Sequence, residues 1–157
     1  LMPPQTVGGM FAGLKEPEDS DDPAQRVYSK AKFMGTHCQG QTEVDVNGIG
    51  PTIRAEHHGN IEYRRLSKEH GGIIDKELKK GLKERRLTPR ECALIQTFPL
   101  DYEFVIPHEE NKQRYILSPS AAYKIIGNAV PPLLAYHIGK RIENLWDLYF
   151  EPDEVII

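Results

Sequence analysis

The sequence contains only two cysteines among its 157 residues, Cys38 and Cys92. Two cysteines do not make a disulfide scaffold, so a reducing cytosol is the expected compartment. No apolar run approaches the roughly 20 residues that a membrane-spanning helix needs, and no charged start followed by an apolar segment indicates a signal peptide. These absences argue against a disulfide-stapled secreted domain and against an integral membrane protein.

What is present is ordinary for a globular protein. Hydrophobic residues make up 39% of the chain and charged residues 27%, and the length suffices for one domain with a small core. Leu1 precedes Met2, so the chain either begins inside a longer sequence or carries an added residue.

Charge is distributed unevenly, although the net charge is only −3. Residues 1–24 hold one lysine and five acids, residues 25–90 hold fourteen Lys/Arg and eight Asp/Glu, and residues 91–157 hold five and ten. A basic segment between acidic flanks predicts a surface that faces a polyanion, because phosphate contacts need clustered cations. Charge alone leaves open the alternative that these side chains form a solvated face.

The first half of the chain predicts loops and short strands. Residues 15–25 are acidic, contain proline and have almost no apolar side chains, so we expect a loop or a mobile segment. Between residues 27 and 65, β-branched and aromatic runs surround Asn47-Gly48, a pair that suits a tight turn with positive φ between two short strands. Residues 73–86 are Lys-rich and contain a glycine, so an exposed helix and a flexible loop fit equally well.

The second half predicts helices. Thr88 and Glu91 have the spacing of a capping box around Pro89, so a helix should run from Pro89 to about Thr97 and stop before the next proline. With strands early and helices late, the expected class is mixed α+β.

Two further helices are expected after this one. Ser118-Pro119 repeats the start signal, and Gly127 suits a left-handed cap at the end of that helix. Pro131-Pro132 opens the last helix, whose apolar residues recur every three or four positions and predict one buried stripe. The residues of this stripe are Leu134, Ile138, Ile142, Leu145 and Tyr149.

The stretches RRLTPRECALIQTFP (85–99) and YKIIGNAVPPLLAYHIGKRI (123–142) resemble the last two sequence blocks, nine and ten, of the DNA methyltransferases that make 5-methylcytosine. The positions that match block nine are Arg85, Leu87, Thr88, Arg90, Glu91, Ala93, Gln96, Phe98 and Pro99. The positions that match block ten are Gly127, Asn128, Ala129, Val130 and Pro132. Both blocks occur in the family's order, and a basic region precedes them.

This resemblance implies a division of the chain. We expect an α+β protein in which a small, β-containing target-recognition domain precedes C-terminal helices that normally pack on a Rossmann-like methyltransferase half, which this chain lacks. The expected segments are an acidic linker over 1–24, the recognition domain with the block-nine helix over 25–99, a linker over 100–117 and the block-ten helical segment over 118–157.

The resemblance also assigns the basic region to DNA recognition. Thr52-Ile53 occupies the place of a short Thr-Leu-like pair in the family, and Thr52 would contact the DNA backbone near the displaced nucleotide. Guanine is read by forked donors and adenine by amide side chains, whereas lysines suit phosphates. The residues expected to bind DNA are Lys30, Lys32, Gln39, Gln41, Thr52, Arg54, Asn60, Arg64 and Arg65. The residues expected to be structural are Arg85, Thr88, Arg90, Glu91 and Gln96.

Cys38 echoes the family's nucleophile but does not match it. The family's cysteine follows a proline and precedes the recognition domain, whereas Cys38 follows His37 inside the recognition region. The family's Glu-Asn-Val block, Gln-x-Arg-x-Arg block and Gly-rich cofactor loop are also absent, so we expect no catalytic residue in this chain. S-adenosyl-L-methionine would be bound mainly by the missing half, and the residues that match Asn128 and Ala129 would add a small part of the pocket wall.

Other readings remain open on the residues alone. Cys92 falls on the block-nine helix and is expected in the core. A zinc-stabilised interaction domain would need ligands such as His37, Cys38, His57 and His58, but their spacing is not that of a zinc site, and we expect no metal. A stand-alone sequence-specific DNA-binding module is the other alternative.

The favoured interpretation is the recognition and structural part of a DNA (cytosine-5-)-methyltransferase, inactive alone, in a bacterial restriction–modification system. Its expected partners are double-stranded DNA and the missing catalytic half, on the same polypeptide or a separate subunit, with self-association as a further possibility and no membrane. It should lie in the bacterial cytoplasm, associated with the nucleoid.

Overall fold

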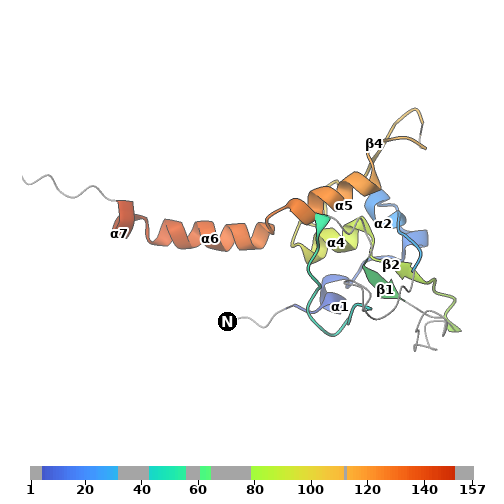
Figure 1. The fold of residues 1–157 in the computed structure, drawn as a ribbon, viewed down its shortest axis with the longest axis horizontal. Helices are drawn as coiled ribbons and strands as arrows, with labels where there is room; N and C mark the ends of the chain where they lie inside the picture. The colour runs from blue at the N-terminus through green and yellow to red at the C-terminus, as the bar shows by residue number, and fades with distance from the viewer. Residues whose placement is uncertain (1–4, 32–42, 56–60, 65–78, 112, 151–157) are drawn as a thin grey trace, which may run out of the picture.

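The computed structural model describes residues 5–31, 43–55, 61–64, 79–111 and 113–150. These residues form a compact body of short helices and two small sheets, from which the C-terminal helices project as a long arm (Figure 1). None of the described helices is long and apolar enough to cross a membrane.

Two helices lie at the centre of the body, and the N-terminal helices pack on the first of them. The central helices are α4 (Pro89–Ile95) and α5 (Pro119–Asn128). The N-terminal elements are α1 (Val7–Met10), the 3-10 helix η1 (Pro17–Asp19) and α2 (Pro23–Arg26). The buried core between these elements consists of Ala24, Ile53, Ile61, Leu87, Cys92, Ala93, Phe104, Val105, Ala122, Tyr123 and Ile126.

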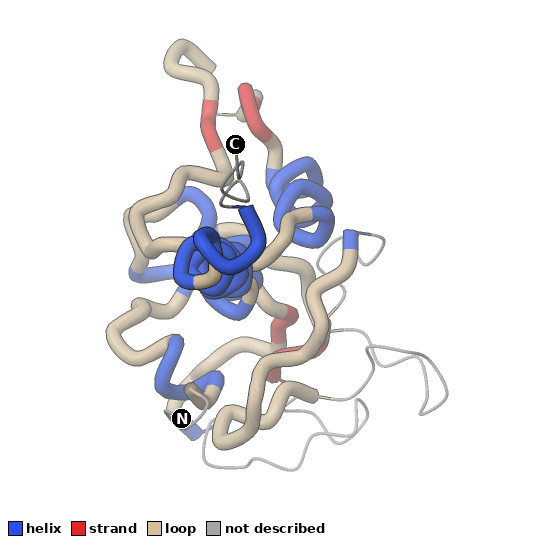
Figure 2. The backbone as a smooth tube through the Cα atoms, turned by 90° about the vertical axis from the view of Figure 1, so that its left-hand side faces the viewer, coloured by secondary structure: helices blue, strands red, loops and turns tan. Residues whose placement is uncertain are grey.

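Two antiparallel sheets, each of two strands, lie apart from one another on this body (Figure 2). In the first, β1 (Glu62–Arg64) pairs with β2 (Arg85–Arg86), and Glu62 faces Arg86. In the second, β3 (Ile106–Pro107) pairs with β4 (Tyr115–Leu117) at the base of a hairpin. The mixture of helices and small sheets agrees with the expected α+β class.

Helix α4 begins as its capping box predicts. The Thr88 hydroxyl accepts a hydrogen bond from the Glu91 amide at 3.1 Å, and the Glu91 carboxylate accepts one from the Thr88 amide at 2.9 Å. These bonds satisfy amide groups that the first helical turn leaves without partners. The helix ends at Ile95, slightly earlier than expected, and Thr97 adopts a left-handed φ of 66° in the turn that follows.

Helix α5 begins at the expected proline but ends differently. Ser118 caps it by accepting a hydrogen bond from the Ala121 amide at 3.3 Å. The expected left-handed cap at Gly127 is wrong, because α5 continues to Asn128 and its capping residue, Ala129, has an extended backbone. Gly127 therefore serves a purpose other than ending the helix.

The Asn47-Gly48 turn forms, but its predicted surroundings do not. The Gly48 amide donates to the Asp45 carbonyl at 3.1 Å, whereas neither turn residue has a positive φ, and residues 43–55 contain no strand. The predicted strand pair is therefore wrong, because the chain near this turn pairs with β1 instead, through the Val44 amide and the Glu62 carbonyl at 2.9 Å. Residues 73–78 of the undecided 73–86 region lie outside the described residues, and at its other end residues 85 and 86 form β2.

Two segments expected to be linkers carry structure. In the acidic segment 15–25, the side chains of Pro17, Ala24 and Gln25 are buried against the core. The segment 100–117 contains strands β3 and β4. The loop or mobile segment expected at 15–25 is therefore packed, since its polar side chains find partners on the body.

The arm consists of α6 (Pro132–Asn144) and α7 (Trp146–Phe150), with a break at Leu145. The start of α6 at the second proline agrees with the sequence prediction. No residue of α6 is buried, and Figure 1 shows the helix leading away from the body. Its apolar stripe is exposed, with 52% of Leu134, 51% of Ile138 and 47% of Ile142 accessible. The predicted burial of the stripe is therefore wrong for Leu134, Ile138 and Ile142, because α6 projects from the body instead of packing on it.

Candidate functional site

The segment 50–55, which contains the Thr-Ile pair, lies between the two central helices. Its Ile53 side chain is buried in the core together with Ile126 of α5. A Cβ added at Gly50 would come within 2.6 Å of Ile95 Cγ2 on α4. A Cβ added at Gly127 would overlap the backbone of residues 54 and 55, coming within 2.7 Å of Ala55 Cα. Thus glycines allow this segment to approach both helices closely.

Direct hydrogen bonds connect the block-nine and block-ten stretches. Gln96 Nε2 donates to the Ala129 carbonyl at 2.8 Å, and the Tyr123 hydroxyl donates to the Leu87 carbonyl at 2.7 Å. The Thr97 hydroxyl accepts from the Leu133 amide at 3.1 Å. The turn after α4 therefore contacts both the end of α5 and the start of α6.

Arg85 of β2 and Glu91 of α4 form a buried ion pair. Arg85 donates from both terminal nitrogens to the two carboxylate oxygens of Glu91, each at 2.8 Å, and the two side chains are only 3% and 2% exposed. The Arg85 guanidinium also lies 4.4 Å from the centre of the Tyr63 ring. The Glu91 carboxylate thus accepts hydrogen bonds from both Arg85 and the Thr88 amide. These additional bonds help to offset the cost of burying the charges.

The acidic N-terminal segment supplies the partners of further arginines. Glu16 accepts two hydrogen bonds from Arg64, at 2.8 and 3.2 Å, and its carboxylate lies 3.5 Å from Arg85 Nε. Burial acts to raise the pKa of Glu16, but the hydrogen bonds and positive charge of Arg64, with the charge of Arg85, outweigh it and lower that pKa. Arg90 pairs with Asp22 and donates to the Tyr102 carbonyl at 2.8 Å.

Further polar contacts extend this junction. The Thr88 hydroxyl donates to Gln25 at 2.7 Å, and Arg86 pairs with Glu62 at 2.7 Å. A hydrogen bond from Tyr28 is the main cause that lowers the pKa of Glu18 to about 2, and burial followed by the same hydrogen bond raises the pKa of Tyr28 to about 12. Hydrogen bonds from neutral groups therefore add to the ion pairs that join the acidic segment to the body.

These ion pairs change the interpretation of the charge pattern. Arginines of the basic middle segment are paired with acids of the N-terminal segment rather than presented together on one face. Arg64, expected to read DNA bases, is only 4% exposed and bonded to Glu16, so this assignment is not supported by its position. The sequence showed the two opposite charges but gave no sign that they would pair.

The remaining candidates divide into two groups. Lys30, Thr52 and Arg54 are exposed on the described surface. Lys32, Gln39, Gln41, Asn60 and Arg65 lie outside the described residues. Sequence reasoning did not identify Gly50, Gly127 or the acids of the N-terminal segment as parts of the site. Of these, Gly127 belongs to the block-ten motif, which could have pointed to it.

The candidate cofactor and cysteine residues occupy different surroundings. Asn128 is exposed at the end of α5, and Ala129 is half-buried beside it. Cys92 is 1% exposed on α4, and burial, with a smaller effect from Glu91, raises its thiol pKa, so it is a core residue rather than a nucleophile. Cys38, His37, His57 and His58 lie outside the described residues.

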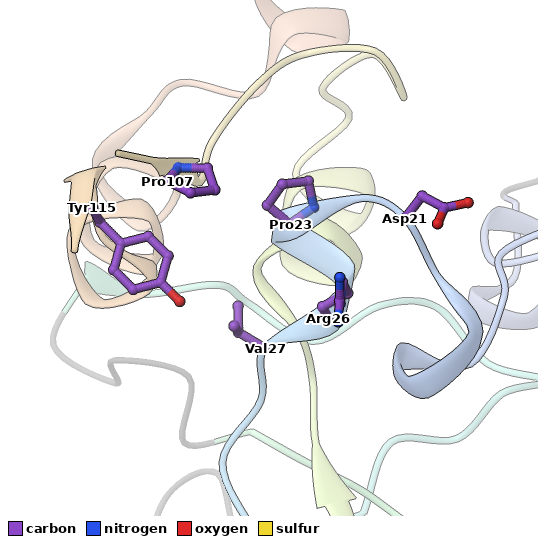
Figure 3. A pocket seen from close by; sticks show the side chains of 6 residues that line it. All are labelled: Asp21, Pro23, Arg26, Val27, Pro107 and Tyr115. Carbon is purple, nitrogen blue, oxygen red and sulfur yellow. The ribbon is translucent and has the colours of Figure 1, made fainter. Parts of the chain in front are cut away.

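An open hollow of about 390 Å³ lies between α2 and the β3–β4 strands (Figure 3). None of the expected DNA-binding or cofactor-binding residues lines it. Its lining consists of Asp21, Pro23, Arg26, Val27, Pro107 and Tyr115. The hollow is therefore separate from the arrangement around the segment 50–55.

Residues 16–144 match the model of the family described as C-5 cytosine-specific DNA methylase. This match covers most of the chain, so the protein belongs to that family.

Individual relatives align over shorter stretches. Type II methyltransferase M.AquIB from Picosynechococcus sp. is 41% identical over 69 residues, which are 43% of this chain and 50% of that protein. Type II methyltransferase M.HgiDI from Herpetosiphon aurantiacus is 34% identical over 99 residues, 62% of this chain and 26% of that protein. DNA (cytosine-5)-methyltransferase 1A from Oryza sativa is 41% identical over 64 residues, 41% of this chain and 4% of that protein. The chain spans half or less of the length of each of these relatives.

The Arg85–Glu91 pair yields a stability prediction. Glu91→Ala should lower the free energy of unfolding by about 3–5 kcal/mol, because it leaves a buried guanidinium without its carboxylate and removes part of the α4 cap. Urea denaturation followed by circular dichroism measures this change. The control is Glu143→Ala, which removes the exposed Lys140–Glu143 pair and should cost less than about 1 kcal/mol. Equal effects of the two substitutions would contradict the structural role of the buried pair.

Proposed function

We propose that this chain is the DNA-recognition and structural part of a DNA (cytosine-5-)-methyltransferase in a bacterial type II restriction–modification system. The complete enzyme would methylate cytosine at C5 within a specific DNA sequence, using S-adenosyl-L-methionine, in the cytoplasm and close to the nucleoid. The observation that carries the proposal is the position of the segment 50–55, which lies between helices of blocks nine and ten with Thr52 and Arg54 exposed.

The chemistry requires groups that this chain lacks. Methylation at a ring carbon needs a thiolate that attacks the neighbouring carbon and an acid that assists at the ring nitrogen. The target base must also leave the duplex before these groups can reach it. Cys92 is buried with a raised pKa, and Cys38 does not follow a proline. We therefore assign the nucleophile to the catalytic half, together with the acid that acts beside it.

The contribution of this chain to cofactor binding is small. S-adenosyl-L-methionine supplies the methyl group when it is bound. Asn128 is exposed at the end of α5 and offers both a hydrogen-bond donor and an acceptor, and Ala129 lies next to it. These two residues would form part of the pocket wall, while the other half supplies the rest.

The exposed α6 supports a missing partner. Leu134, Ile138 and Ile142 are each about half-exposed on one helix, and such apolar stripes on helices face a packing partner. The partner we propose is the Rossmann-like catalytic half.

The first test of the proposed function is methyl transfer. The purified chain alone should transfer no tritiated methyl group to cytosine, and co-expression with the catalytic half from the same genomic locus should restore transfer. A control reaction contains the catalytic half alone, which should be inactive without its recognition part. Methylation of cytosine by this chain alone would contradict the proposal.

The second test is DNA binding. The chain should bind duplex DNA weakly, with an affinity that falls as salt rises, because phosphate contacts release counterions. Lys30→Glu should weaken binding to all sequences alike, whereas Arg54→Ala should weaken any sequence preference. Lys140→Glu, on the arm, is a control of equal charge change. If Lys30→Glu and Arg54→Ala changed DNA binding no more than this control does, residues 25–90 would not form the recognition surface.

The third test concerns the arm. Burying an apolar side chain contributes roughly 1.5–3 kcal/mol, so the exposed stripe of α6 should drive self-association of the isolated chain. Sedimentation velocity should show oligomers that Leu134→Ser combined with Ile138→Ser reduces to monomers, while Lys140→Ser and Glu143→Ser on the same helix leave them intact. The catalytic half should also dissolve the oligomers. A wild-type chain that stays monomeric at high concentration would overturn this prediction.

A further inference from the structure

The segment 50–55 is seated between α4 and α5 by two glycine contacts. Gly50 allows close approach to a side chain, since an added Cβ would lie 2.6 Å from Ile95 Cγ2. Gly127 allows close approach to a backbone, since an added Cβ would overlap Arg54 C and Ala55 N. At both glycines an added Cβ would therefore lie closer to its neighbour than non-bonded atoms ordinarily approach.

We propose that Gly127 and Gly50 are positioning residues for DNA recognition. By letting the segment 50–55 lie directly against both helices, they fix where Thr52 and Arg54 meet DNA. This inference rests on the proposed function, which assigns those two side chains to DNA contact. Neither glycine touches DNA itself.

The contacts around Gly127 determine what moves when it is replaced. The end of α5 is held by the hydrogen bond from Gln96 to the Ala129 carbonyl at 2.8 Å, and its middle by the bond from Tyr123 to the Leu87 carbonyl at 2.7 Å. The segment 50–55 has Ile53 as its buried anchor, and residues 52 and 54 on either side are exposed. Because these two bonds hold α5 in place, a methyl group at 127 should displace the segment 50–55.

The two contacts differ in how they can be relieved. The atoms facing Gly127 belong to the backbone, so no side-chain rotation makes room for a Cβ. The atoms facing Gly50 belong to Ile95, so truncating Ile95 to alanine removes the overlap. This difference provides a rescue experiment for one site and none for the other.

The test compares Gly127→Ala with Gly139→Ala in the full chain. Gly139 lies on α6, where an added Cβ meets nothing within 4 Å, and alanine favours a helix over glycine, so it is a matched control. The probes are a fluorescein-labelled duplex of random sequence and a duplex selected from a random pool by the wild-type chain. Thr52→Ala serves as the reference for loss of a DNA contact. Hydrogen exchange of the amides 52–55 and the melting temperature are measured in parallel.

We expect Gly127→Ala to lower the affinity for the selected duplex by about tenfold while the affinity for the random duplex changes less than about twofold, because phosphate contacts from elsewhere remain. Exchange at residues 52–55 should rise. Gly139→Ala should change neither affinity. Unchanged selectivity in a folded Gly127→Ala protein would overturn the inference, as would an equal loss of both affinities in a variant whose melting temperature shows that it is folded.

Gly50→Ala keeps the proposal testable if the Gly127 variant does not fold. It should also reduce selectivity, and Gly50→Ala combined with Ile95→Ala should restore it. Failure of that rescue in a folded double variant would refute the positioning role. Failure of the proposed function is distinguishable, because the wild-type chain would then show no sequence preference, or Arg54→Ala would leave that preference unchanged.

Discussion

The described body depends on one buried interaction, the pairing of Arg85 with Glu91. Glu91 caps α4 and binds both terminal nitrogens of Arg85 at 2.8 Å. Arg85 in turn lies beside Glu16 and Tyr63. Because a buried charge is costly without partners, this pair requires the acidic N-terminal segment, β1, β2 and α4 to meet at one place. The block-nine stretch is thus a junction of four chain segments as well as a helix.

A second constraint is the close approach of the segment 50–55, which carries Thr52 and Arg54, to helices α4 and α5. Gly50 and Gly127 leave no space for a side chain where the segment 50–55 meets α4 and α5. The hydrogen bond from Gln96 to the Ala129 carbonyl joins the turn after α4 to the end of α5, and the one that the Thr97 hydroxyl accepts from the Leu133 amide joins it to the start of the arm. DNA contact and cofactor contact are therefore proposed for neighbouring parts of one packed unit, since Asn128 follows Gly127 directly.

The arm contrasts with this unit. Its helices have the apolar periodicity of a buried element, yet no α6 residue is buried. Helices of this kind gain most of their stability from packing of the apolar face, so the arm is the part of the described chain whose energetics depend most on another molecule or domain. The body and the arm thus differ in what stabilises them. Ion pairs and close packing at glycines within the chain stabilise the body, whereas the arm requires burial of its apolar face against another molecule or domain.

The sequence by itself determined the local features. The α4 capping box, the starts of α5 and α6 at prolines, the α+β class and the methylase family are all readable from residues close together in the chain, because caps and periodicity are local. Only the tertiary structure decided the long-range ones. In the structure Arg64 pairs with Glu16, so it is no longer a candidate DNA reader. The strands are β1 and β2 and do not lie around Asn47-Gly48. Gly127 lies against residues 54 and 55 and does not end a helix. These contacts join residues far apart in sequence, so their partners depend on how the whole chain packs, which no local pattern encodes.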